Sequence, residues 1–142
     1  MDIPSSFWEC CLPRKTQIAM AELIAPIIAL RSHPEVFTDR AATYYIDNVV
    51  AVSALVLGAS RAADLSKMGL AFSCMSHKLN FPHWIEWVAS ASNAADDGSR
   101  KGAAESTARS LGIPVSGSNF EQAWLRDILQ ASPAEIVRTV LG

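Results

Sequence analysis

The chain has 142 residues, 50% of them hydrophobic and 18% charged, so it can fold around one core but is too short for two ordinary domains. Its formal net charge of −2 at pH 7 excludes a strongly basic protein that coats nucleic acid, because binding to phosphates requires a surplus of Lys and Arg. An enzyme that holds nucleic acid through a metal ion and a few local cations is still compatible with this charge.

The cysteines and the N-terminal sequence bear on the cellular compartment. The three cysteines include no CxxC pair, and an odd count does not suit a secreted disulfide framework. The first residues lack the basic and apolar regions of a signal peptide, and no uninterrupted run of about 18 apolar residues occurs. We therefore expect an intracellular protein, cytoplasmic or nuclear, that is neither secreted nor inserted in a membrane.

In chain order, the first half is predicted to contain helices around one strand. Residues 1–13 hold apolar side chains without a clear period, which we interpret as a loop or short helix that needs a partner surface. Apolar residues at three- and four-residue spacing then predict a helix that starts near Thr16, contains Pro26 and stops at His33-Pro34. A β-branched and aromatic run predicts a strand over 43–47, and helices are expected over 49–57 and 61–79.

The second half is predicted to add one more strand and a group of helices. Alternating side chains indicate a strand over 83–88, followed by a polar loop and a weakly helical segment that ends near residue 111. A linker over 112–119 then precedes a helical pair over 120–129 and 133–141. We expect a main domain over 1–111 and a small C-terminal helical tail over 120–142.

Two strands joined by helices favour parallel pairing and an α/β fold. Two strands are also too few to cover the helices around them, so an apolar strand edge should be left open to association. Trp84 and Trp87 fall on opposite faces of the second strand, because side chains alternate along a strand. We expect one of these indoles in the core and the other available to a partner or a nucleotide.

Three carboxylates stand in positions that could bring them to one edge of the sheet. Asp47 follows directly on the first strand, at the edge where open α/β sheets place their chemistry. Glu22 lies in an otherwise aliphatic helix, and Asp96 lies in the polar loop after the second strand. Converging carboxylates are typical ligands of Mg²⁺. Each also has a simpler interpretation: Asp47 as a helix cap, Glu22 turned to water, and Asp96 as a solvated loop acid.

Several short segments of the chain, in this order, resemble one family. The segments, which together cover roughly residues 13–101, are Pro13-Arg14-Lys15-Thr16-Gln17-Ile18, Ala21-Glu22-Leu23, Tyr45-Ile46-Asp47-Asn48, Gly58-Ala59-Ser60-Arg61 with Asp64-Leu65, and Trp87-Val88 leading through Ser92-Asn93-Ala94-Ala95-Asp96 to Ser99-Arg100. They are similar to the RNase H-like domain that follows reverse transcriptase in retroelement (retrotransposon) polyproteins. The resemblance implies a partial RNase H-like fold, a mixed sheet with flanking helices whose first strands are missing.

The resemblance also implies a chemistry and a set of site residues. Members of the family are hydrolases that cut the RNA strand of RNA–DNA hybrids with Mg²⁺ held by four acids, three of which correspond to Glu22, Asp47 and Asp96 as catalytic and metal-binding residues. Asn48, Asn93 and Ser99 then become candidates for substrate binding. The family's first catalytic Asp lies on a central strand upstream of the helix that carries Glu, and this chain has no counterpart. We therefore expect a truncated domain with impaired or absent nuclease activity and weak Mg²⁺ binding.

Two other interpretations stay open. In the first, the chain is a non-catalytic binding or assembly module that docks on another protein, or on a second copy, through its exposed strand edge. In the second, no stable protein exists and the sequence is a translated remnant.

Overall fold

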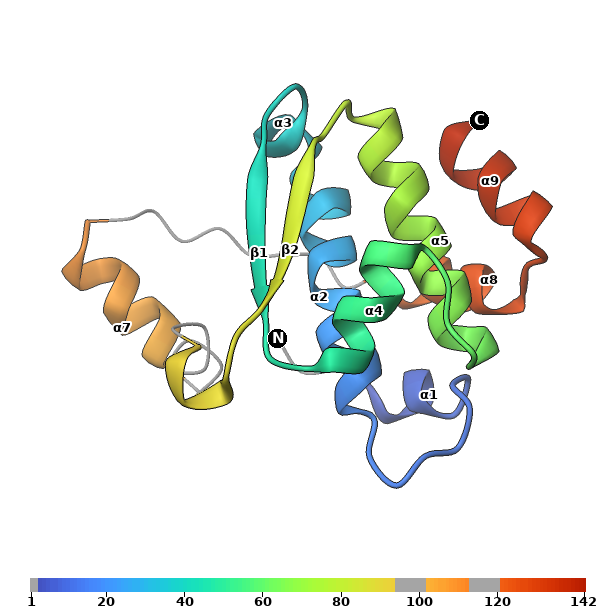
Figure 1. Ribbon diagram of the computed structural model, residues 1–142, viewed down its shortest axis with the longest axis horizontal. Helices are drawn as coiled ribbons and strands as arrows, with labels where there is room; N and C mark the ends of the chain where they lie inside the picture. The colour runs from blue at the N-terminus through green and yellow to red at the C-terminus, as the bar shows by residue number, and fades with distance from the viewer. Residues whose placement is uncertain (1–2, 94–101, 113–120) are drawn as a thin grey trace.

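Two parallel strands form the sheet in the computed structural model, which describes residues 3–93, 102–112 and 121–142. Strand β1 (Ala42–Ile46) pairs with β2 (His83–Trp87), with Ala42 opposite His83 and Ile46 opposite Trp87. The chain passes from β1 to β2 through α4 (Val49–Leu57) and α5 (Ala63–Lys78), a crossover of the length that parallel strands require (Figure 1). The predicted parallel pairing and mixed α/β class are confirmed for the described residues.

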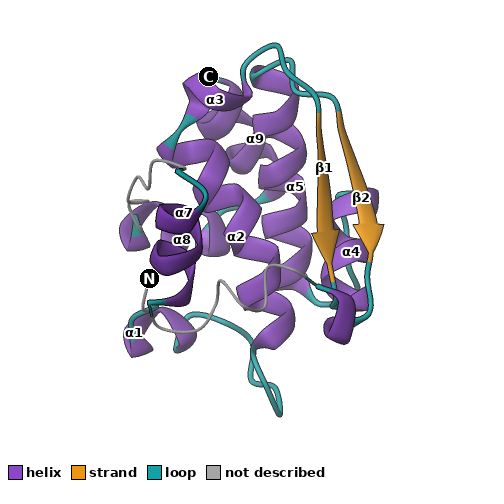
Figure 2. Cartoon of the chain, turned by 90° about the vertical axis from the view of Figure 1, so that its left-hand side faces the viewer, coloured by secondary structure: helices purple, strands orange, loops and turns teal. Residues whose placement is uncertain are grey.

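Helices cover one side of this sheet, as the edge-on view in Figure 2 shows. The central helix is α5, which packs against α2 (Ile18–Ser32), α4, α8 (Gln122–Gln130) and α9 (Pro133–Leu141). The inner face of the sheet meets α5 through Tyr44, whose ring lies edge-on to Phe72 at 6.1 Å. The other described helices are the short α1 (Ser5–Trp8), α3 (Pro34–Phe37), η1 (Ser90–Ser92) and α7 (Ala103–Ser110).

The interior position of α2 explains its sequence. Apolar side chains occupy nearly its whole circumference, and Leu23, Ile24 and Ile27 are fully buried. A helix that is apolar on all sides is normally a core helix. Pro26 is buried in this setting, where surrounding packing offsets the backbone hydrogen bond that a proline removes from a helix interior.

Both ends of the described chain contribute to the same core. Phe7 of α1 is fully buried, so the apolar N-terminal segment finds its partner surface within this chain. The C-terminal helices bury Leu125, Ile128 and Ile136 in the cluster that also contains α2 and α5. The predicted helical pair after residue 120 is thus part of the main packing unit. The predicted linker lies outside the described residues from position 113 onward.

The outer face of the sheet is uncovered by any described element. Thr43 and Tyr45 of β1 and Trp84 and Glu86 of β2 point to this face, and all four are exposed. The expectation that Trp84 or Trp87 belongs to the core is wrong, because Trp87 is also 50% exposed. Trp87 shares its face with buried Ile85 but stands at the end of β2, where its indole N–H donates to the carbonyl oxygen of Asp47 at 3.1 Å.

No helix in the parts of the chain that the structure describes is long and apolar enough to cross a membrane.

Candidate functional site at the carboxyl edge of the strands

Asp47 and Asn48 follow β1 and have different partners. Asn48 caps α4, since its Oδ1 accepts hydrogen bonds from the backbone N–H groups of Val50 and Ala51, each at 3.0 Å. The Oδ2 of Asp47 instead accepts a hydrogen bond from the Ser90 hydroxyl at 2.7 Å. The helix-cap interpretation of Asp47 is therefore wrong, because its neighbour performs that role. The carboxylate of Asp47 is left half-buried and directed to the segment after β2.

The segment after β2 is tied to the end of β1 by main-chain and side-chain contacts. The N–H of Val88 donates to the carbonyl of Ile46 at 3.1 Å, which extends the strand ladder by one residue. The indole of Trp87 and the hydroxyl of Ser90 then reach the carbonyl and the carboxylate of Asp47. As parallel pairing requires, both strands end at one edge, and the loop that leads towards Asp96 starts beside Asp47.

The other predicted site residues divide between described and undescribed parts of the chain. Glu22 is half-buried on α2, which packs against α4, and the first half of α2 lies at the level of the end of β1 in Figure 1. Asn93 is half-buried directly after η1, and its N–H donates to the carbonyl of Ser90 at 3.1 Å. Asp96 and Ser99 lie outside the described residues. Within the described ranges, no three His, Cys, Asp or Glu residues are grouped closely enough to hold a metal ion.

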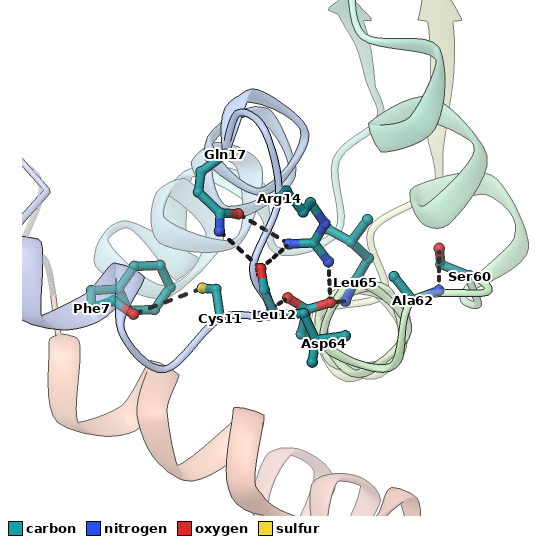
Figure 3. A network of polar contacts seen from close by, with 9 residues as sticks. All are labelled: Phe7, Cys11, Leu12, Arg14, Gln17, Ser60, Ala62, Asp64 and Leu65. Atoms are coloured by element: carbon teal, nitrogen blue, oxygen red, sulfur yellow. Dashed lines mark hydrogen bonds and ion pairs between the residues drawn. The ribbon is translucent and has the colours of Figure 1, made fainter.

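A second polar cluster, absent from the sequence-based site, joins the start of α2 to the start of α5 (Figure 3). Asp64 is 5% exposed and forms an ion pair with the Arg14 guanidinium. Its Oδ2 accepts from the N–H of Leu12 and its Oδ1 from the N–H of Leu65, both at 2.9 Å. The Gln17 side chain completes the network, because it accepts from Arg14 at 3.0 Å and donates to the Leu12 carbonyl at 3.0 Å.

The charge of Asp64 is stabilised by these donors. Burial raises the pKa of the Asp64 carboxyl, but the hydrogen bonds from Arg14, Leu12 and Leu65 outweigh this effect and hold the pKa below its ordinary value of 3.8. Asp64 also lies in the first turn of α5, where the helix dipole favours a negative charge. Both oxygens of this carboxylate are thus engaged within the chain, and its role is to fix the segment around Arg14 on α5.

This cluster joins segments that are far apart in the sequence. The segment with Arg14 and Gln17 and the pair Asp64-Leu65 are 47 or more residues apart in the chain but in direct contact in the fold. Beside them, burial and the charge of Asp64 raise the pKa of the Cys11 thiol to about 11. The Cys11 thiol is therefore largely protonated at neutral pH.

One hollow of the described chain lies away from both clusters, between the ends of α2, α5 and α9. Its volume is about 260 Å³, and its cations are already engaged. The Lys78 ammonium donates to the carbonyl of Val140 at 2.8 Å, and Arg31 pairs with Glu121 while lying 4.5 Å from the ring centre of Trp124. These contacts hold the C-terminal helices on the core.

The fold and the candidate site together define an α/β unit with a parallel β–α–α–β crossover and an acid at the carboxyl edge of its first strand. No protein-family model, no curated protein and no solved structure matches this chain.

Proposed function

We propose that the chain is an RNase H-like unit derived from a retroelement, descended from magnesium-dependent endonucleases that cut the RNA strand of RNA–DNA hybrids. We further propose that it binds Mg²⁺ weakly and does not cleave a hybrid on its own. The observation that carries the proposal is the position of Asp47. It stands at the carboxyl edge of a parallel strand, is relieved of helix capping by Asn48, and contacts the segment that leads to Asp96.

The proposal requires only a single, weakly held Mg²⁺. This ion keeps several of its waters in proteins and commonly binds to one or two carboxylates. Glu22, Asp47 and Asp96 are the residues that hold it in this proposal, with Asn93 and Ser99 towards the substrate. When bound, Mg²⁺ polarises phosphate oxygens and lowers the pKa of a bound water.

Activity in this chemistry depends on a second ion. The two-metal scheme needs a carboxylate shared between both ions, and the family places it on a central strand next to the strand that ends in Asp47. The described residues contain no third strand beside β1 and therefore no carboxylate at that position. Asn48 contributes by position in this proposal, since its cap fixes the start of α4 and leaves Asp47 free to bind a cation.

A magnesium titration followed by NMR at the side-chain carboxyl carbons tests the proposal. We expect millimolar Mg²⁺ to shift the signals of Asp47 and Glu22, and Asp47→Asn to abolish the shift at Glu22. Asp127→Asn, at an exposed acid on α8, is the matched control and leaves the shift unchanged. A titration without any change at Asp47 contradicts metal binding, and robust hybrid cleavage that Asp47→Asn abolishes contradicts the inactivity of the isolated chain.

The open edge of β1 favours a second candidate function, a non-catalytic assembly module. The N–H of Ala42 and the carbonyl of Ile46 point towards β2, so the N–H and carbonyl groups of Thr43 and Tyr45 point to the opposite edge. No described strand pairs with them. An extended segment of another protein that adds to this edge gains main-chain hydrogen bonds and covers exposed Tyr45.

Replacement of Thr43 by Pro tests this candidate. A proline at this position removes an outward-facing N–H without breaking a bond to β2, so the fold should persist while strand addition is lost. Light scattering on wild type and variant provides the measurement, with a Pro replacement of exposed Ala41, before the strand, as the control. Unchanged association in the Thr43→Pro variant contradicts docking at this edge.

A further inference from the structure

Helix α4 is apolar on two opposite faces, and only one of them is covered. Ala51, Ala54 and Leu55 are buried against α2 and α5. On the other side, four aliphatic side chains are 50% to 73% exposed: Val49, Val50, Val56 and Leu57. A helix that is apolar all round is normally buried on all sides. The outward face of α4 therefore has the composition of an interface rather than of a solvated surface.

The spacing of this outward face is symmetric about exposed Ser53. Val50 and Val56 lie three residues before and after Ser53, and Val49 and Leu57 lie four residues before and after it. Residues at spacings of three and four share one helix face. We propose that α4 is the contact between two copies of this chain, which pair antiparallel about a two-fold axis through Ser53. Val49 then lies at the level of the partner's Leu57, and Val50 lies at the level of the partner's Val56.

The charges at the two ends of α4 and the small residue at its centre favour the antiparallel arrangement. Helix α4 has no charged residue, so no like charges meet when two copies pair. Asp47 precedes the helix and Arg61 follows it, so antiparallel pairing directs the acidic end of one copy towards the basic end of the other, whereas parallel pairing sets like charges side by side. The small side chain of Ser53 on the axis allows the helices to approach to the 8–10 Å typical of packed pairs.

The exposed apolar area is sufficient for a specific contact of moderate strength. Val56 borders a hollow with Trp84 and Ile85 of β2, so the outward face of α4 continues onto the sheet. With Trp84, the four aliphatic side chains expose on the order of 600 Å² per copy, which corresponds to the lower end of specific interfaces. This interface does not include the free edge of β1, and it is independent of the proposed nuclease ancestry.

Sedimentation equilibrium on the full chain tests the proposal. We expect the mass to rise from 15.3 kDa towards twice that value over micromolar concentrations, and Leu57→Glu to weaken the dimer at least tenfold. Leu111→Glu is the matched control, because Leu111 is a similarly exposed leucine beyond α7 and its replacement leaves dimerisation unchanged. Circular dichroism verifies that both variants are folded. A wild type that stays monomeric, or equal association in the two variants, overturns the proposal.

A cysteine cross-link tests the two-fold axis without weakening the interface. In a Cys10→Ser background, oxidised Ser53→Cys should form an interchain disulfide rapidly, because the two positions meet on the axis. Ser106→Cys, at an exposed serine on α7, is the matched control and should stay largely uncrosslinked. Equal rates of cross-linking at the two positions contradict the arrangement.

Discussion

The contribution of the Asp64–Arg14 ion pair to stability can be worked out from its surroundings. Asp64→Asn keeps the shape of the side chain but removes the charge that pairs with Arg14. The Asn carbonyl oxygen can still accept from one backbone N–H, while the other N–H meets an amide group that donates. The variant therefore leaves a half-buried guanidinium without its counter-charge and one of the two backbone donors, Leu12 or Leu65 N–H, without an acceptor.

Breaking a fully buried ion pair costs about 3–5 kcal/mol, and the 20% exposure of the Arg14 side chain reduces this by solvent screening. We expect Asp64→Asn to lower the free energy of unfolding by about 2–3 kcal/mol at pH 7. The loss should depend on pH. Because the pKa of Asp64 is depressed in the folded state, its stabilisation is present above the ordinary value of 3.8 and is lost as pH falls through the lower folded pKa.

Urea denaturation followed by circular dichroism measures this loss at pH 7 and again near the acid limit of folding. Arg14→Met and the double variant complete a thermodynamic cycle, and a coupling energy of at least about 1 kcal/mol is expected between the two positions. Asp127→Asn, at an exposed acid, controls for the loss of one negative charge. A change below about 0.5 kcal/mol for Asp64→Asn, or additive single variants, refutes the role assigned to this pair.

Three further predictions concern packing, capping and the sheet edge. Gly69→Ala should destabilise the fold by about 1–3 kcal/mol in thermal denaturation, because an added Cβ lies 2.5 Å from the backbone oxygen of Ala54. Asn48→Ala should cost about 1 kcal/mol in urea denaturation through loss of the α4 cap, and equal stability of this variant and wild type contradicts the assignment. In amide hydrogen exchange, Thr43 and Tyr45 should exchange faster than the alternate residues of β1, and uniform protection along the strand indicates a partner on the open edge.

Local sequence patterns predicted the bounds of a helix or strand well where a strong stop signal was present. The helix over 49–57 was predicted with the bounds that the structure shows, because Gly58 adopts the left-handed conformation that ends it. The strand over 43–47 is displaced by one residue, to Ala42–Ile46. This small shift changes the interpretation of the site, since Asp47 then stands outside the strand and Asn48 takes the cap position.

The remaining differences arise from tertiary information that a local pattern does not contain. Asp and Asn are equally good N-cap residues, so residue type does not decide between Asp47 and Asn48. The N-cap is the last residue with an extended backbone before the helix, and in the structure that residue is Asn48. Alternation placed Trp84 and Trp87 on opposite faces, but burial of Trp87 depends on how far the helices extend under the strand. Asp64 and Arg14 are 50 residues apart, and nothing in either local sequence indicates that they meet.

The carboxylate edge and the outward face of α4 start only two residues apart, at Asp47 and Val49, yet the two proposed sites are separate in space. Val49, the first residue of α4, precedes Ser53 by four residues, or about 6 Å along the helix axis, so an antiparallel pair holds the starts of its two α4 helices about 12 Å apart along that direction. Asp47 comes before the helix, so neither of the two Asp47 residues lies on the axis of such a dimer. It follows that Leu57→Glu should weaken association at least tenfold while leaving the Mg²⁺-dependent shift at Asp47 intact, and that Asp47→Asn should abolish this shift while the apolar contact between the two α4 helices persists. A variant pair in which association and metal binding are lost together contradicts this geometry and requires one shared site.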